Sequence, residues 1–306
     1  MNKIYLIIIT LVLAASCSIK YQQPEIDTQT LIRDIDPNDN TFEISSLKWK
    51  EFYQDPLLQE LIDSALINNL DLRVAIKRIE ESSEYFKQGK ASFYPTLGTG
   101  VNANYGKSVL NTETSPYFSF GFNASWEIDI WDKLGSAKRA KYQDLLAQIN
   151  TKNAIQTSLI SNLATAYINL ISLDSKKKYV LETIKNREEY LETVISLKES
   201  AQVNEVAVLQ AKAQLLEAQT YIPNINNAIQ QSENSICKLL GKTPRSIKRS
   251  SVESLMKNTL KLDSIGVPAN LLRNRPDVLS AENNVISFME NYNSAKAALY
   301  PSLTIS

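Results

Sequence analysis

The feature that most constrains this chain is a long stretch without helix breakers. From Leu134 to about Ser200 the sequence contains no proline and, beyond Gly135, no glycine. Apolar residues recur there in steps of three and four, as on the packed face of a helix. They are Leu145, Ile149, Ile155, Leu159, Leu163, Tyr167, Leu170, Leu173, Leu181, Ile184, Leu191, Val194 and Leu197. At about 1.5 Å per residue, about 66 residues would span about 100 Å, far more than one globular core needs.

A second helix is predicted to return beside the first. After a break at about 200–205, a helical pattern runs from Val206 to Leu240, where Gly241 and Pro244 provide stop signals. Pro223 lies inside this pattern and is expected to kink the helix or change its coiling. The two helices predict a long antiparallel hairpin. A cytoskeletal or scaffolding coiled coil has the same periodicity, so this feature alone leaves that interpretation open.

An internal duplication runs through the body of the chain. A shift of 206 residues aligns Asp71–Leu97 with Asp277–Leu303 without a gap. Both copies contain the pattern Lys-Ala-x-x-Tyr-Pro-x-Leu, in which a predicted helix gives way to the start of an alternating strand. Two unrelated amphipathic helices would share a period but not this pattern at one fixed offset. We therefore predict a tandem repeat.

The first copy continues into two segments that alternate as β-strands do. Residues 97–106 and 118–128 place apolar side chains on one face and Gly, Asn or Ser on the other, with a polar loop expected at about 107–116. A soluble β-sandwich would also alternate. The small polar residues and a length near the ~9–11 residues of a tilted transmembrane strand favour a membrane hairpin. The pore-lining candidates are Gly98, Asn102, Asn104, Ser119, Asn123 and Ser125, and the lipid-facing candidates are Val101, Tyr105, Phe118, Phe120, Phe122 and Trp126.

Residue usage excludes several classes of site. The chain has no histidine and only two cysteines, which excludes a Ser-His-Asp triad and a Cys/His zinc site. Lys+Arg and Asp+Glu both count 33, so no charge excess indicates nucleic acid as a partner. Composition does not exclude carboxylate or lysine chemistry, but no motif for it is present. We predict a protein that is not an enzyme and uses no cofactor or metal.

The N-terminus is predicted to be a targeting segment. A short positive start precedes an apolar run at Ile4–Ala15 that is too short for a transmembrane helix. The small residues directly before Cys17 resemble a bacterial lipobox, in which the cysteine is lipidated and becomes the first residue of the mature protein. Ser18 fits sorting to the outer membrane. An ordinary secretory signal cleaved near Ala15 is the alternative.

Three smaller features complete the pattern. In Arg275-Pro276-Asp277, proline suits the first turn of a helix and the carboxylate suits its N-terminus, so this motif is expected to be structural. Cys237 is expected to be a packed core thiol. Trp126 and Trp131, where strand meets helix, either anchor at the membrane interface or pack against a neighbouring element.

Six segments together resemble TolC-like outer-membrane efflux proteins, most of all the lipoprotein branch that serves multidrug pumps. In the order seen in that family, they are WKEFYQDPLLQELIDSALINNLDLRVAIKRI, ASFYPTL, WEIDIWDKL, VLQAKAQLLEAQ, LLGKTP and GVPANLLRNRPDVLSAENNV. The most specific element is Leu-Leu-x-x-Arg-Pro-Asp-Val at 271–278. The resemblance extends from about Ile19 to Ser306.

The resemblance implies a mainly α fold with a transmembrane β-hairpin. In the family, long antiparallel helical hairpins and strands from three protomers form one outer-membrane β-barrel of twelve strands and a tunnel across the periplasm. It implies a homotrimer in outer-membrane lipid that docks on a periplasmic adaptor (membrane fusion) protein and an inner-membrane pump of the resistance-nodulation-division type. The location implied is the outer membrane of a Gram-negative bacterium, with an acyl anchor of the palmitate kind and a periplasmic extension.

Six segments are predicted on this basis. They are a lipoprotein signal peptide at 1–16, a lipidated tether at 17–45, helices of the first repeat at 46–95, a transmembrane β-hairpin at 96–130, a long periplasmic helical hairpin at 131–244, and the start of a second repeat at 245–306. The second repeat has only begun its first strand at Ser306, so we expect a C-terminally truncated sequence whose 306 residues alone do not conduct. Ala201 stands where the family commonly has glycine at the tip turn.

The predicted function is a passive trimeric conduit for small molecules or drugs in a tripartite efflux system. Two alternatives remain open from the sequence. One is a lipid-anchored periplasmic coiled-coil structural or adaptor protein, and the other is an outer-membrane channel for type I protein secretion. The exported substrate, the partner pump and the gating residues are not encoded in any motif found.

Overall fold

A computed structural model describes residues 19–23, 48–108, 111–257 and 274–306. The chain divides into two compact units. The first contains Met1–Leu31, Ala75–Asn153 and Leu272–Ser306, and the second contains Ile32–Val74 and Ala154–Leu271. Helices dominate, with one three-stranded sheet among the described residues, which confirms the mainly α prediction with a β-hairpin. Cys17, the predicted signal peptide and most of the predicted tether lie outside the described residues.

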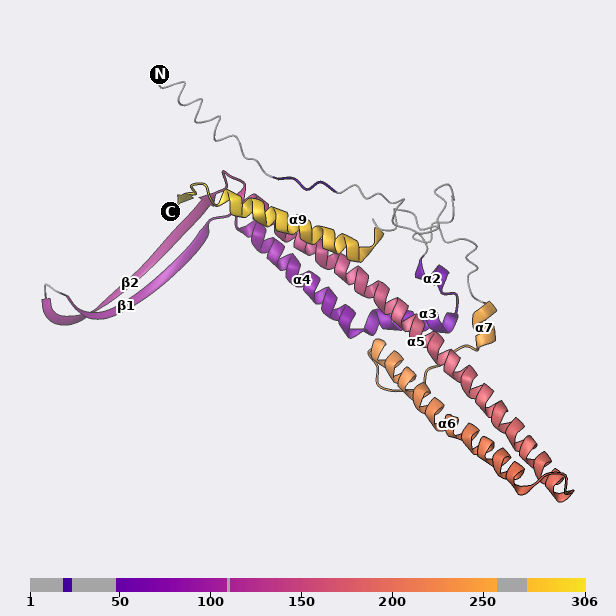
Figure 1. Ribbon diagram of the computed structural model, residues 1–306. Coiled ribbons are helices and arrows are strands. Elements are labelled where there is room, and N and C mark those ends of the chain that lie inside the picture. The colour runs from indigo at the N-terminus through magenta and orange to yellow at the C-terminus, as the bar shows by residue number, and fades with distance from the viewer. Residues whose placement is uncertain (1–18, 24–47, 109–110, 258–273) are drawn as a thin grey trace, which may run out of the picture. The chain divides into compact units, whose positions relative to one another are not determined.

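The sheet of the first unit is an antiparallel hairpin with a short third strand. Strands β1 (Thr96–Ser108) and β2 (Asn111–Ile128) extend away from the helices of this unit (Figure 1). Strand β3 (Leu303–Ile305) pairs antiparallel with β2. The predicted polar loop at 107–116 is wrong, because Lys107 pairs with Thr114 and Tyr105 with Pro116. Threonine-rich polar segments retain strand propensity, so the ladder continues through them.

Helix α9 (Pro276–Ala297) lies antiparallel to the first part of α5 (Lys133–Glu199). Serines seven residues apart on α9 donate hydrogen bonds of 2.5–3.0 Å across this contact: Ser280 to the carbonyl of Ala147, Ser287 to Asp144 Oδ1, and Ser294 to the carbonyl of Lys133. A small side chain every two turns lets the helix axes approach while its hydroxyl group stays satisfied.

The residues of helix α4 (Leu70–Ala91) that belong to the first unit pack on α5. The Phe86 and Tyr142 rings lie 5.2 Å apart, and the Lys138 ammonium group lies 4.7 Å from the Phe93 ring. Helices α4 and α9 are both 22 residues long and end 206 residues apart, each followed by Tyr-Pro and a strand. This confirms the predicted duplication. Pro276 occupies the first turn of α9, also as predicted.

The second unit has an apolar core formed by α3 (Pro56–Asn68), the rest of α5, and α6 (Glu205–Leu239). Two short helices, α2 (Trp49–Phe52) and α7 (Val252–Lys257), lie at its edge and contribute partly buried side chains. Its fully buried side chains include Ile62, Leu163, Leu170, Ile236 and Leu240. Cys237 is a free thiol in this core, only 1% exposed, which confirms the packing prediction.

Buried polar groups connect the elements of this core. Asp55, 2% exposed, caps α3 by accepting from the amides of Leu57 and Leu58 at 2.8 and 3.2 Å. Its other oxygen accepts from the Tyr167 hydroxyl group at 3.3 Å, and that hydroxyl group accepts from the amide of Ser250 at 2.9 Å. Burial raises the pKa of Tyr167, so its hydroxyl group keeps the proton that it donates to Asp55.

The predicted helical hairpin is confirmed, because α5 and α6 begin and end within one or two residues of the predicted limits. Arg187 Nη1 donates to Gln214 Oε1 at 2.5 Å between the two helices, and Lys198 pairs with Glu205 beside the turn. In the described ranges, no helix combines the length and apolarity needed to cross a membrane.

The two helices end in the same backbone motif with different residues. Gly241 and Ala201 both adopt the left-handed conformation, with φ of 63° and 57°. In each motif the amide of the following residue bonds back five positions, Lys242 to Cys237 and Gln202 to Leu197, both at 2.9 Å. The prediction that Gly241 ends α6 is confirmed. The strained alanine at the tip was not predicted.

Replacing Ala201 by glycine and Gly241 by alanine should change the free energy of unfolding in opposite directions. Ala201→Gly is expected to stabilise the chain by about 0.5–1 kcal/mol, because the left-handed conformation disfavours a Cβ. Gly241→Ala is expected to destabilise it by about 2–4 kcal/mol, since the new Cβ would also lie 2.5 Å from the carbonyl oxygen of Asn68. Urea unfolding of the two purified variants tests both signs. Equal changes in the free energy of unfolding in the same direction for both variants would contradict the left-handed strain assigned to Ala201.

Candidate functional site

The register of the hairpin sorts the candidate residues into two faces. Gly98 lies opposite Asn123 and Asn102 opposite Ser119, whereas Val101 lies opposite Phe120. Because side chains alternate along a strand, all six pore-lining candidates share one face and all six lipid-facing candidates share the other. One member of the first face was missed: Asn104 lies opposite Tyr117, which places an exposed aromatic ring on the otherwise small and polar surface.

The apolar face is uncovered. Phe118, Phe120 and Phe122 are 73%, 64% and 80% exposed, and Val101 and Tyr105 are similarly open. The Phe120 and Phe122 rings touch edge to face with centroids 4.8 Å apart. A soluble sandwich would cover such a face with a second layer, yet no element of the described chain packs on it. A contiguous aromatic surface of this kind requires a partner or lipid.

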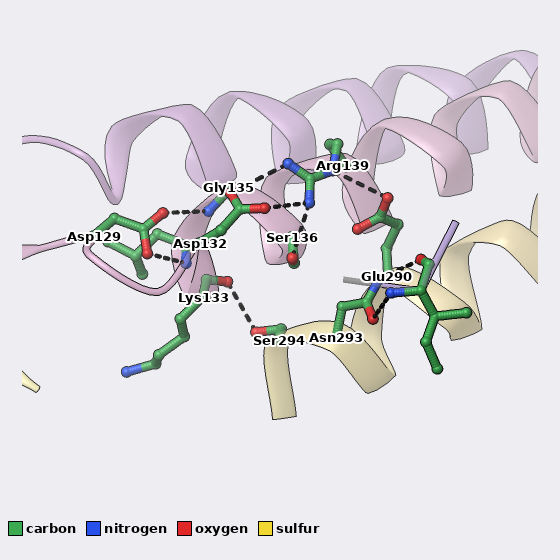
Figure 2. Close-up of polar contacts among 11 residues, drawn as sticks. Asp129, Asp132, Lys133, Gly135, Ser136, Arg139, Glu290, Asn293 and Ser294 are labelled. Atoms are coloured by element: carbon green, nitrogen blue, oxygen red, sulfur yellow. Dashed lines mark hydrogen bonds and ion pairs between the residues drawn. The ribbon is translucent and has the colours of Figure 1, made fainter. Parts of the chain in front are cut away.

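A polar cluster fixes the joint between β2 and α5 (Figure 2). Asp129 caps the helix by accepting from the amides of Leu134 and Gly135 at 3.1 and 2.7 Å. Asp132 adopts a left-handed φ of 59° and accepts from Arg139, which also donates to Glu290 of α9 at 3.0 Å. Hydrogen bonding to Asp132, and then to Glu290, raises the pKa of Arg139, so the guanidinium group stays charged. The strand therefore meets the helix at a rigid turn.

Asp129, Asp132 and Arg139 were not singled out from the sequence, and Glu290 stood out only as the residue that matches Glu84 in the duplication. Asp129 and Asp132 lie within WEIDIWDKL, one of the segments that carry the family resemblance. The segment was therefore recognised, but the hydrogen-bonding roles of its two aspartates were not predicted. Their partners could not be read from spacing, because Glu290 lies 151 residues from Arg139.

Gly135 is required by this joint. A Cβ on residue 135 would lie 1.8 Å from Asp132 Oδ1, whereas a Cβ on Gly89 of α4 would make only ordinary contacts at 3.5 Å or more. Alanine normally stabilises a helix position by about 1 kcal/mol over glycine. We expect Gly89→Ala to show that gain and Gly135→Ala to destabilise by about 1–3 kcal/mol, because it displaces the paired carboxylate. Urea unfolding of both variants measures this, and a stabilising Gly135→Ala would contradict the role of the joint.

Both tryptophans near the joint make direct contacts. Trp126 Nε1 donates to the carbonyl of Phe93 at 3.0 Å, and Trp131 Nε1 donates to the carbonyl of Pro301 at 3.0 Å. Trp131 also stacks on Tyr300 with centroids 4.8 Å apart. These contacts match the packing alternative, and an interfacial role for the exposed ring edges stays a prediction.

An apolar stripe on α9 is exposed although its counterpart on α4 is buried or half-buried. Val278, Val285, Phe288, Tyr292 and Leu299, here named the α9 stripe, are 37–84% exposed. The residues 206 positions earlier are buried or half-buried: Leu72, Ile79, Ser82, Phe86 and Phe93. Within the first unit Phe86 and Phe93 contact Tyr142 and Lys138 of α5, whereas no such ring contact is shown for their exposed counterparts Tyr292 and Leu299 among the described residues.

The fold is the one found in outer-membrane channel proteins. The chain matches a crystal structure of CusC, studied for conformational changes accompanying folding and transmembrane channel formation, with a TM-score of 0.77 at 25% identity. The match covers 94% of this chain and 65% of that one. The chain belongs to the outer membrane efflux protein family, whose model matches residues 61–242.

Two curated relatives are equally similar in sequence. The cation efflux system protein CusC of Escherichia coli is 29% identical over 258 residues, which cover 84% of this chain and 56% of CusC. The toluene efflux pump outer membrane protein TtgF of Pseudomonas putida is 29% identical over 270 residues, covering 85% and 55%. The chain thus spans about half the length of the curated relatives it matches.

Proposed function

We propose that this chain is the outer-membrane channel component of a tripartite efflux system, with a lipid anchor at Cys17. The uncovered phenylalanine face of the hairpin carries the proposal. A bilayer can cover that face, because the backbone groups of the strands pair within the sheet and the aromatic side chains meet hydrocarbon. The opposite face, with Gly98, Asn102, Asn104, Ser119, Asn123 and Ser125, would line a passive aqueous path whose selectivity is set by width and polarity.

The open edges of the hairpin also require that it assemble with strands of other subunits. A two-stranded hairpin has open edges that are not tolerated against lipid, so it must join strands of other subunits. We place it in the barrel of a homotrimer, with residues 96–130 in the membrane and 131–244 in the periplasm. The α9 stripe is a second surface that such an assembly would cover. A periplasmic adaptor and an inner-membrane pump of the resistance-nodulation-division type complete the proposed system.

The substrate cannot be carried over from relatives. CusC and TtgF are equally identical to this chain, yet one is named for cations and the other for toluene. We therefore propose export of small molecules without naming one, and protein secretion remains the alternative within the channel class. The proposal includes no catalytic step.

Conductance of the native product tests the proposal. We expect the native product extracted from isolated outer membranes to form stable channels in planar bilayers, whereas residues 1–306 alone should not. Asn102→Asp with Asn123→Asp should shift the reversal potential toward cation selectivity, while Val101→Leu on the other face should not. Recovery of a lipidated protein from the outer membrane that gives no conductance would favour the lipid-anchored periplasmic coiled coil instead.

A further inference from the structure

The segment that follows Cys17 is bound to α9 through its backbone. The amide of Ile19 donates to Asn293 Oδ1 at 3.2 Å, and Asn293 Nδ2 donates to the carbonyl of Ile19 at 3.0 Å. Two residues later the Tyr21 hydroxyl group donates to Glu282 Oε1 at 3.0 Å. Residues 19–21 therefore run along α9 from its C-terminal end toward its N-terminal end.

One side chain satisfies both backbone groups of one residue. A primary amide offers a donor and an acceptor side by side, as a neighbouring strand would, so the contact fixes the position of Ile19 and not merely its proximity. Asn293 is 6% exposed and Ile19 is 48% exposed, so both hydrogen bonds are partly buried and only partly open to competition from water. Removing the amide group would leave two backbone groups of Ile19 without these partners.

The duplication shows that this contact is specific to α9. The positions on α4 that correspond to Asn293 and Glu282 are Lys87 and Ile76. Neither side chain can accept from an amide, and isoleucine cannot accept from a tyrosine. The two helices have the same length, so the N-terminal segment has a defined docking position on one of the two duplicated helices only.

The contact also determines where the chain end can lie. Asn293 is adjacent to Ser294, which bonds to the carbonyl of Lys133 at the start of α5, beside the strand–helix joint. Cys17 precedes Ile19 by only two residues in the sequence, so the segment that Asn293 holds follows directly on the predicted lipidation site. An acyl group on Cys17 would thus start near the end of the helical layer from which the β-strands extend.

We propose that Asn293 is a positioning residue for the lipid anchor: its amide clamps Ile19 and holds acylated Cys17 beside the strand–helix joint on α9, not on the duplicated α4. This inference rests on lipidation of Cys17 in the proposed function. The clamp thereby connects the lipidated N-terminal segment to α9, which lies in the second repeat. Anchoring and strand insertion then occur in one place on the molecule.

A distance measurement in the acylated chain tests the clamp. Nitroxide labels are placed at Gln22→Cys and Ala298→Cys in a Cys237→Ser background, since acylated Cys17 carries no free thiol. The protein is purified from outer membranes and intact mass reports its acyl chains. Labelled chain is diluted with unlabelled chain so that distances between protomers do not contribute. We then expect one narrow distance distribution, lost in Asn293→Leu but kept in the matched Asn291→Leu at an exposed position of the same helix. Ile19→Pro removes the amide donor while leaving α9 unchanged and should also lose the narrow distribution.

The outcomes separate the clamp from the anchor. A narrow distribution that persists in acylated Asn293→Leu overturns the clamp and leaves the lipid anchor standing. If Asn293→Leu fails to accumulate, Ile19→Pro decides by the same criterion. A wild-type product whose mass contains no acyl chains overturns both the anchor and its positioning, whatever the distance distribution shows.

Discussion

Replacing Phe118, Phe120 and Phe122 together with lysine is expected to abolish insertion of the hairpin into the outer membrane. Lysine on the lipid face of a transmembrane strand costs about 2–4 kcal/mol near the bilayer midplane, so three substitutions cost about 6–12 kcal/mol. This is comparable to the whole stability of a typical domain, about 5–15 kcal/mol. Because an acyl anchor on Cys17 would keep even an uninserted chain in the outer-membrane fraction, insertion is measured as protection of the hairpin from protease in isolated outer membranes. A periplasmic hairpin would lose only some packing, so the substitutions separate the channel from the coiled-coil alternative.

The opposite face supplies a matched control. Ser119, Asn123 and Ser125 alternate with the phenylalanines on the same strand, so their replacement by lysine adds the same charge to the same segment. Facing water, these lysines should leave insertion largely intact and shift selectivity toward anions. Equal loss of insertion in both triple variants would contradict the assignment of the two faces.

Local patterns in the sequence were sufficient for the elements of this fold. The period of three and four predicted α5 and α6, and Gly241 predicted the end of α6, because helix periodicity and left-handed caps depend on neighbouring residues alone. Alternation predicted the two faces of the hairpin for the same reason. It failed at residues 107–116, where polar composition indicated a loop although the backbone continues to pair.

Contacts that fix the elements in place could not be predicted in this way. Arg139 meets Glu290 across 151 residues, and Asn293 meets Ile19 across 274. A charged or amide side chain on a helix has many suitable partners in a sequence, and only the fold selects one. The left-handed conformation of Ala201 was not predicted either, because alanine itself carries no signal for it and only the glycine common at this position in the family pointed to a special backbone there.

Arg249→Met is expected to lower the free energy of unfolding of the second unit by about 3–5 kcal/mol. Arg249 donates to Asp174 and to Glu233, and its own side chain is 19% exposed. Hydrogen bonding to Asp174 is the main cause that raises its pKa, so the guanidinium group is charged throughout the accessible pH range. Methionine has similar length but no charge, which leaves two carboxylates facing each other. Urea unfolding of the purified chain measures the loss.

The two carboxylates should differ in how much of that loss they cause. Glu233 is 13% exposed and also accepts from the amide of Ile247 at 3.2 Å, so without Arg249 it would be a buried, uncompensated charge. Asp174 is 40% exposed and can be hydrated again. Adding Glu233→Gln to Arg249→Met is therefore expected to restore more than half of the lost stability, whereas adding Asp174→Asn should restore about 1 kcal/mol or less. Equal rescue by both would show that charge repulsion, and not burial of Glu233, makes Arg249 necessary.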